Sequence, residues 1–212
     1  EEMAPVSASD HVRGNRNAKI VFVDYSDLEC PFCKMFHWSM EEVVKKYGKE
    51  IAWVYRHYPL DCDGGKTPNC RQLHKQARKE AEAAECVAEL GGEEKFWQYI
   101  DKIFAVTPSN DGLDLAQLPV YVKELGIDQA AFNTCLESGR HADKIVEDTT
   151  DGTNIGLDGT PFVVAIDKDS DTTIVALRGP APEETSDLFK EISAYLDEQQ
   201  QINYQRLTSG SQ

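Results

Sequence analysis

Two short apolar blocks near the N-terminus have the composition of β-strands. Residues 20–26, IVFVDYS, are rich in β-branched and aromatic side chains and predict a buried strand. Residues 51–59, IAWVYRHYP, predict a second strand that Pro59 ends. Between them, residues 31–48 place apolar side chains at helical spacing, and Gly48 is a suitable stop. The chain therefore begins as strand, helix, strand.

The middle of the chain has helical periodicity. From about residue 71 to residue 154, apolar positions recur three or four residues apart, and we find no strand pattern. Residues 71–90 predict a long helix closed by Gly91 and Gly92, and Pro119 marks a kink or a late start in a later helix. We therefore expect a helical block at this place in the chain.

Strand patterns return after the helical block. Residues 162–167 and 172–179 flank the turn KDSD and predict an antiparallel hairpin, and residues 184–199 predict a last amphipathic helix. Strands in two groups, with helices between them, indicate an α/β fold with helices packed on a small mixed sheet and a helical insertion. The expected division is residues 12–65 and 144–198 for the sheet-containing part, 66–143 for the insertion, and 1–11 and 199–212 for flexible tails.

Composition narrows the classes of protein. The chain has 212 residues, of which 41% are hydrophobic, enough for a large core. No stretch approaches the ~18 apolar residues of a membrane span, and the polar first ten residues show no signal peptide. A net charge of −15 disfavours nucleic-acid binding. The densest basic stretch, residues 71–79, is expected to be the solvated face of a helix.

The pair CPFC at residues 30–33 is the main chemical signal. Pro31 suits the first turn of a helix, so Cys30 is expected at the helix N-terminus and Cys33 one turn inside it. A helix N-terminus favours the thiolate of Cys30, and Cys33 can resolve a mixed disulfide. C-x-x-C beside a strand–helix unit is the signature of a thioredoxin-like redox site.

Two other readings of CPFC have less support. A tetrahedral zinc site usually takes a second closely spaced pair, whereas the next cysteines, Cys62 and Cys70, are eight positions apart. A purely structural disulfide gains more from closing a longer loop than this one. We therefore expect no metal and no cofactor at this site.

The longer motifs give a resemblance to a known family. FVDYSDLECPFCKMF, followed far downstream by GTPFVV, resembles the DsbA family of thiol–disulfide oxidoreductases, in the bacterial branch that carries CPFC. The resemblance extends over about residues 12 to 198. It implies a thioredoxin fold with an inserted helical domain.

The resemblance also implies roles for individual residues. Cys30 resembles the exposed nucleophile and Cys33 the buried resolving thiol. Thr160 and Pro161 resemble the loop in which a cis-proline faces the disulfide and meets the substrate, a place that proline fits at the start of a strand. Asp24 matches the buried acid that helps to deprotonate the resolving cysteine, and its alternative is a strand-edge carboxylate in water. Together with Thr160 and Pro161, Pro31 and Phe32 are expected to contact substrate.

One departure from the family bears on the redox character. Many strongly oxidising members have histidine where this chain has Phe32, and Asp27 and Glu29 add negative charge beside Cys30. Negative charge disfavours the thiolate. We therefore expect a milder oxidant, with a higher Cys30 pKa than in the histidine-bearing members. His37, one turn past Cys33, is interpreted as a surface or packed histidine.

Four further cysteines allow three pairings. We favour structural bridges Cys62–Cys70, which closes a short loop, and Cys86–Cys135 within the helical block. The alternative is buried free thiols. Two structural bridges beside a redox pair favour a location outside the cytoplasm, in the periplasm or on the cell-wall side of a membrane, with a membrane anchor as one option.

These expectations combine into a function. The chain is expected to introduce disulfides into reduced, unfolded exported proteins, as a monomer. The family implies reoxidation by a membrane quinone-linked partner of the DsbB or VKOR type. The alternatives are a disulfide isomerase or reductase of the same fold, and a non-catalytic peptide-binding module.

Overall fold

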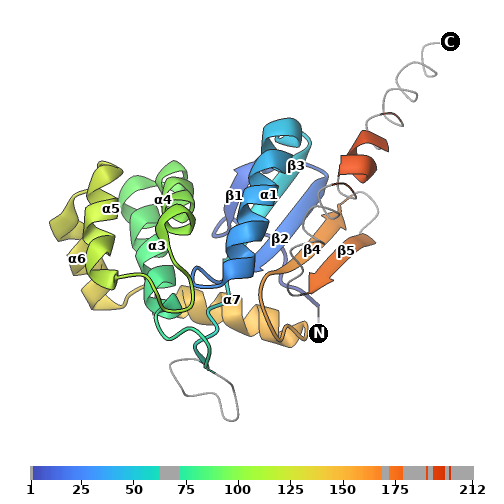
Figure 1. The fold of residues 1–212 in the computed structure, drawn as a ribbon. Helices are drawn as coiled ribbons and strands as arrows, with labels where there is room; N and C mark the ends of the chain where they lie inside the picture. The colour runs from blue at the N-terminus through green and yellow to red at the C-terminus, as the bar shows by residue number, and fades with distance from the viewer. Residues whose placement is uncertain are drawn as a thin grey trace.

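A five-stranded mixed sheet with helices packed against it forms the frame of the molecule (Figure 1). The computed structural model describes residues 2–62, 72–168, 172–178, 190, 193–198 and 201. The strands are β1 (His11–Gly14), β2 (Ile20–Ser26), β3 (Ile51–His57), β4 (Phe162–Asp167) and β5 (Thr172–Arg178). The helices are α1 (Pro31–Tyr47), α3 (Ala77–Gly91), α4 (Glu93–Val106), the 3-10 turn η1 (Leu115–Gln117), α5 (Leu118–Glu124), α6 (Gln129–Ser138) and α7 (Ala142–Asn154).

Strand β2 lies at the centre of the sheet. The strand order is β1-β3-β2-β4-β5, with β2 parallel to β3 and antiparallel to β4. The β4–β5 pair forms the antiparallel hairpin predicted from the sequence. The two groups of strands thus meet along β2, although the helical block separates them in the chain. This arrangement confirms the α/β fold with a helical insertion.

Alternation along β2 and β3 sends side chains to two cores. Phe22 and Trp53 contribute to the core under α1, which also receives Phe36 and Met40 from that helix. Val21, Val23, Ala52 and Val54 lie in a second core on the opposite face. Because side chains alternate with a period of two, Asp24 shares the α1 face with Phe22.

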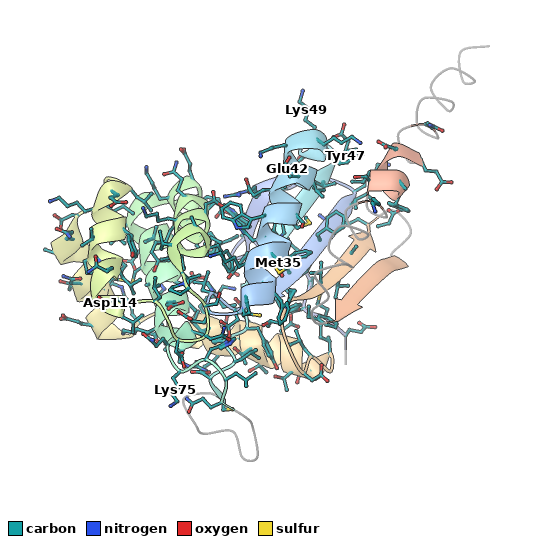
Figure 2. All side chains as sticks on the ribbon, in the orientation of Figure 1. Met35, Glu42, Tyr47, Lys49, Lys75 and Asp114 are labelled. Carbon is teal, nitrogen blue, oxygen red and sulfur yellow. A yellow bond between two sulfur atoms is a disulfide. The ribbon has the colours of Figure 1, made fainter. Side chains whose placement is uncertain are left out.

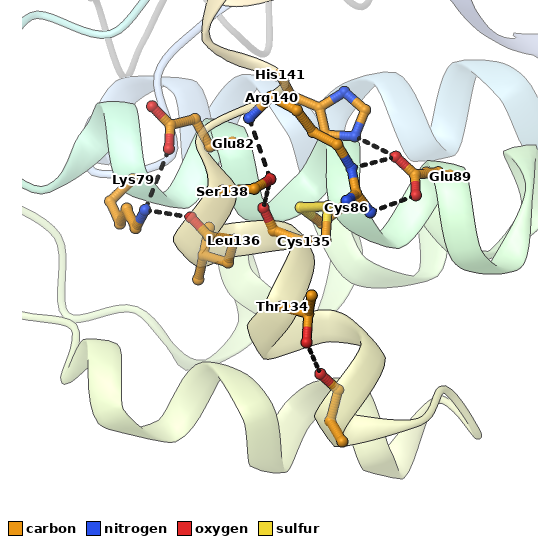
Figure 3. The surroundings of a disulfide bond; sticks show 11 residues. Lys79, Glu82, Cys86, Glu89, Thr134, Cys135, Leu136, Ser138, Arg140 and His141 are labelled. Carbon is orange, nitrogen blue, oxygen red and sulfur yellow. Dashed lines mark hydrogen bonds and ion pairs between the residues drawn. A yellow bond between two sulfur atoms is a disulfide. The ribbon is translucent and has the colours of Figure 1, made fainter.

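The insertion shares its core with the α1 face of the sheet. Helices α3, α4, α5 and α6 pack together beside α1 (Figure 1), and Phe96 and Ile100 of α4 belong to the same buried cluster as Phe36. Cys86 of α3 and Cys135 of α6 form a disulfide, which confirms that predicted bridge (Figure 3). The insertion is therefore anchored to the elements that carry CPFC.

Helix α7 crosses the end of the sheet where β3 ends (Figure 1). Arg56 of β3 donates hydrogen bonds to Asp151 of α7 at 2.6 Å and to Asp10 at 2.9 Å. Gly152 makes the close approach possible, because a Cβ there would lie 2.8 Å from the ring of Tyr58. Helix α7 thus connects the insertion back to the central strands.

Two elements differ from the sequence expectations. Strand β1 was not predicted, because HVRG is short and polar and gains its strand conformation by pairing with β3. Helix α3 begins at Ala77, not at residue 71. The backbone N–H groups of Leu73 and His74 instead donate to the carbonyl of Leu60, which holds this segment against the loop after β3.

Some predicted elements lie outside the described residues. The predicted last helix at 184–199 is described only at residue 190 and residues 193–198, which are helical. The predicted Cys62–Cys70 bridge involves Cys70, which lies in the part that is not described. The proposed boundaries at residues 65, 143 and 198 stay predictions.

Candidate active site

Cys30 is the N-cap residue of α1 and Pro31 is the first residue of the helix. The backbone N–H of Lys34 donates to the Cys30 carbonyl at 3.1 Å, which begins the helical hydrogen bonding. Cys33 lies one turn inside α1, on the face that packs on the sheet. Both are free thiols in this structure. The local geometry predicted for CPFC is therefore present.

The two thiols differ in acidity. The hydrogen bond from the Cys33 thiol, followed by that from the Cys33 backbone N–H, lowers the pKa of Cys30 to about 6 in spite of its burial. Burial raises the pKa of Cys33 well above its ordinary value, and the neighbouring Cys30 raises it further. At neutral pH the pair therefore carries one thiolate, on Cys30.

Exposure separates the two cysteines less than the resemblance implied. Cys30 is only 3% exposed, against 0% for Cys33, so the expectation of an exposed nucleophile is wrong for this structure. The reason is the loop before β4: the Cys30 Sγ lies 3.5 Å from the Thr160 carbonyl oxygen. Acidity, more than accessibility, distinguishes the two thiols.

The loop before β4 brings residues from the far end of the chain to CPFC. The Thr160–Pro161 peptide bond is cis, in agreement with the geometry expected for this loop. Thr160 is buried and its carbonyl accepts a hydrogen bond from the Cys30 thiol. Because β4 pairs with β2, the sheet itself fixes this loop beside the end of β2 from which CPFC follows.

Asp24 is a buried residue of β2, six residues before Cys30 in the chain and close to both cysteines. It is 1% exposed, and burial raises the pKa of its carboxyl group well above the ordinary value, an effect only partly offset by the Trp53 indole. Its charge would interact with both Cys30 and Cys33. Asp24 is thus a buried acid with a raised pKa near the resolving thiol, and not the solvated strand-edge carboxylate of the alternative interpretation.

Asp27 organises the turn between β2 and α1. Its carbonyl accepts the Cys30 N–H at 3.1 Å, and its own N–H donates to the Cys33 Sγ at 3.4 Å. Its fully buried carboxylate accepts three hydrogen bonds, from the N–H groups of Glu29 and Leu60, each at 2.7 Å, and from Nδ1 of His74 at 2.9 Å. One residue thereby contacts both cysteines through its backbone.

Sequence reasoning did not identify His74. It belongs to the basic stretch 71–79, which was expected to be solvated, yet it is only 5% exposed. Burial lowers the pKa of His74, but the hydrogen bond and the charge of Asp27 outweigh burial and leave the pKa raised. The sequence carried one usable signal: His74 directly follows the irregular loop after the second strand, near the end of the sheet where CPFC was expected.

A pair of buried glutamates lies next to CPFC. Glu29 and Glu80 of α3 are both 0% exposed. Burial, and then the hydrogen bond and charge of Glu29, raise the pKa of Glu80 to about 10. Glu29 also accepts a hydrogen bond from the Gly112 N–H at 3.2 Å, and its carbonyl accepts one from Asn110. The residue before Cys30 is thus tied to the insertion at two points.

The remaining predicted positions lie around α1. Pro31 and Phe32 are partly buried, and Phe32 packs against the main core. Met35 is 36% exposed on the outer side of the same helix (Figure 2). His37 is buried, with Nε2 2.8 Å from Asp101, and burial lowers its pKa. His37 is therefore a packed histidine, one of the two interpretations given above.

Two groups in the described part of the chain bring three possible metal ligands together. In the first, Arg13 forms ion pairs with both Glu41 and Asp101, so a cation already lies beside the carboxylates around His37. In the second, the sulfurs of Cys86 and Cys135 are joined in the disulfide near His141 (Figure 3). Neither group has the free ligand set of a metal centre.

Known proteins resemble this chain over most of its length. A family model described as Thioredoxin matches residues 7–179. The structure of DsbA2 from Pseudomonas aeruginosa is 29% identical and covers 85% of this chain and 92% of that one, with a TM-score of 0.66. BdbD from Bacillus subtilis, in its oxidised form, is 18% identical, covers 89% of this chain and 94% of that one, and has a TM-score of 0.67.

Curated relatives are much longer than the region in which they resemble this chain. A protein of Salinispora tropica named Na(+)/H(+) antiporter NhaA 3 is 34% identical over 160 residues, which are 75% of this chain but 22% of that protein. A Mycolicibacterium vanbaalenii protein named Na(+)/H(+) antiporter NhaA 1 is 30% identical over 154 residues, with 72% and 22% covered. The chain thus spans about a fifth of these relatives. In the part described here, we find no helix that is long and apolar enough to cross a bilayer.

Proposed function

Because this chain belongs to the thioredoxin family and has the DsbA-like form of its fold, we propose that it is a thiol–disulfide oxidoreductase that introduces disulfides into exported proteins. The observation that carries the proposal is the unequal pair: Cys30 with a pKa of about 6 at the start of α1, and Cys33 with a strongly raised pKa beneath it. A thiol with a low pKa is a good leaving group, which favours passing a disulfide onward.

The proposed reaction starts from the Cys30–Cys33 disulfide. A substrate thiolate attacks the Cys30 Sγ, the intramolecular S–S bond breaks, and Cys33 leaves with the electron pair and takes up a proton. A second substrate thiolate then attacks the substrate sulfur of the mixed disulfide, and Cys30 leaves as a thiolate. The substrate loses two electrons and the enzyme gains them. The buried acid Asp24 is the proposed proton donor to Cys33.

The Thr160–Pro161 loop is the proposed substrate contact. The Thr160 carbonyl oxygen lies 3.5 Å from the Cys30 Sγ, so a peptide that binds to this carbonyl lies directly against the reacting sulfur. Pro31 and Phe32 border Cys30 on the helix side and are proposed to contact the same peptide. Reduced, unfolded proteins are the proposed substrates, because a short backbone contact selects extended chains with little regard to sequence.

Location and partners are proposed on chemical grounds. The Cys86–Cys135 disulfide favours an oxidising compartment, outside the cytoplasm. Two electrons then have to leave Cys30 and Cys33 after each cycle, and a membrane quinone-linked partner of the DsbB or VKOR type is the proposed acceptor. We propose that the chain acts as a monomer. We do not propose ion transport for this chain, because it spans only about a fifth of the relatives that are named antiporters.

The reduction potential tests the proposal. The Cys30–Cys33 pair is equilibrated with glutathione buffers and the reduced fraction is measured. A potential at or above about −180 mV, the value typical of disulfide isomerases, would mean that the chain gives disulfides away, as an oxidase or an isomerase, whereas a value near about −270 mV would assign the chain to the reductases. A refolding assay on a reduced substrate with Cys30→Ser as control separates both from a peptide-binding module, which would keep its effect without the thiol.

A further inference from the structure

His74 lies at the meeting point of three segments near the redox pair. Its backbone N–H donates to Leu60, in the loop after β3, at 3.0 Å. Its imidazole Nδ1 donates to the carboxylate of Asp27, in the turn before CPFC, at 2.9 Å. Its own segment leads into α3. The histidine is 5% exposed, so its side chain is held in one place.

The contact to Asp27 is transmitted to both cysteines by the backbone. Asp27 accepts the Cys30 N–H through its carbonyl and donates its N–H to the Cys33 Sγ. The N–H and the C=O of Asp27 belong to the two peptide groups that flank this residue, so a rotation of either group would disturb one of these bonds. The carboxylate of Asp27, which His74 helps to fix, is therefore the point that sets the orientation of this turn.

Charge gives the contact a second effect. Buried Asp27 carries negative charge close to Cys30, which raises the Cys30 pKa. A protonated His74 neutralises that charge and is attracted to the Cys30 thiolate. The charged or titratable groups that act on the imidazole are Asp27, Cys30 and Asp111, the last from the loop after α4. All three are negative when ionised, so all favour the imidazolium.

We propose that His74 is a positioning residue for the redox pair: its hydrogen bond to Asp27 holds the turn that contacts both cysteines, and its protonated form stabilises the Cys30 thiolate. This positive charge comes from the segment before α3 and not from between the two cysteines, where this chain has Phe32. The inference deepens the proposed function, because it assumes that Cys30 and Cys33 are the redox pair.

The first test uses the unmodified protein. Coupling between two sites is reciprocal, so a His74 that stabilises the Cys30 thiolate has a higher pKa in the reduced protein than in the oxidised protein, where no thiolate exists. The His74 ring is titrated by NMR in both states. We expect a difference of about half a pH unit or more.

The second test changes the charge and keeps the hydrogen bond. His74→Gln can still donate to Asp27 but carries no charge. The pKa of Cys30 is expected to rise by about half a unit or more. The equilibrium constant for reduction of the Cys30–Cys33 disulfide by glutathione is expected to fall in parallel, by about threefold. In the Asp27→Asn background, His74→Gln is expected to have a smaller effect than alone, because the two residues act through one contact. The matched control His141→Gln is expected to leave the titration unchanged.

The outcomes separate this inference from the proposed function. An identical His74 pKa in the reduced and oxidised protein, or an unmoved Cys30 titration in folded His74→Gln, would overturn the positioning role while the function stands. If the unmodified protein does not exchange with glutathione at all, the proposed function fails instead. Should His74→Gln not fold, the NMR titration of the unmodified protein still decides the question.

Discussion

Glu80 of α3 lies against Glu29, the residue immediately before Cys30, and both carboxyl groups are fully buried. Two carboxylates cannot both ionise at such a site without a large electrostatic cost, so Glu80 holds a proton at neutral pH. Burial and the contact with Glu29 raise the pKa of Glu80 to about 10. The insertion therefore delivers a neutral acid to the edge of the redox site.

The Glu29–Glu80 pair predicts a pH dependence of stability. The pKa of Glu80 is about 10 in the folded chain and 4.5 when unfolded. Between these values the folded state binds one more proton, so the free energy of unfolding falls as pH rises. Glu80→Gln keeps a hydrogen-bond donor and removes this proton uptake. We expect the fall in the free energy of unfolding between pH 5 and pH 8 to be smaller in Glu80→Gln than in the parent chain, by roughly 1–3 kcal/mol.

Urea unfolding at several pH values measures this effect. Glu42→Gln on α1 is the matched control, because its side chain is 60% exposed (Figure 2), and it is expected to leave the pH dependence unchanged. If the parent chain and Glu80→Gln have parallel profiles of unfolding free energy against pH, Glu80 does not hold the proton.

Cys33→Ala tests what lowers the Cys30 pKa. The hydrogen bond from the Cys33 thiol is the largest cause of the low value, so its removal is expected to raise the Cys30 pKa from about 6 by about one unit or more. The backbone N–H of residue 33 remains and keeps the pKa below that of an ordinary cysteine. Ultraviolet thiolate absorbance against pH gives the value. An unchanged midpoint would assign the effect to the helix N-terminus alone.

Asp24→Asn tests the proton donor. Burial raises the pKa of the Asp24 carboxyl group well above its ordinary value, so the neutral amide is expected to change the unfolding midpoint little, but the amide cannot exchange a proton with Cys33. We expect formation of the mixed disulfide, the step in which Cys33 leaves and takes up a proton, to slow by about 10²-fold. Quenched-flow trapping of a Cys30-linked peptide follows this step directly. A variant that forms the mixed disulfide at the parent rate would leave Asp24 with a structural role only.

The Cys86–Cys135 disulfide is expected to stabilise the insertion. It joins residues 49 apart in sequence, and a loop of that size corresponds to roughly 4 kcal/mol in the chain-entropy model. The double variant Cys86→Ala/Cys135→Ala is expected to lower the thermal midpoint while the Cys30 titration stays the same, since both sulfurs lie away from CPFC. Coincident loss of stability and of Cys30 acidity would indicate that the insertion supports the site more strongly than this.

The sequence predicted the parts of the site that depend on local pattern. The start of α1 at Pro31 follows from the position of proline after a strand, and the cis Thr160–Pro161 bond agrees with the family resemblance. His74 and Glu80 could not be predicted in the same way. Their partners, Asp27 and Glu29, lie about fifty residues earlier in the chain. Only tertiary packing decides whether such polar side chains face the site or water.

The exposure of Cys30 illustrates the same limit. The N-cap position in α1 fixes the location of the Cys30 sulfur, but the loop at Thr160 determines how much of that sulfur is exposed to water. That loop is placed by the pairing of β4 with β2. The expected comparison of the Cys30 pKa with histidine-bearing relatives stays a prediction, and titrating both proteins under one set of conditions would settle it.

The central position of β2 has a consequence for the order of events during synthesis. Strand β3 follows soon after β2, but β4 comes only after the whole insertion. A ribosome-bound chain that ends before residue 162 therefore carries CPFC on a strand with one unpaired edge and without the Thr160 loop over Cys30. In any chain that ends before residue 135, Cys86 also lacks its disulfide partner. The last strand pair, the loop over Cys30 and this disulfide are therefore all completed after CPFC has been made.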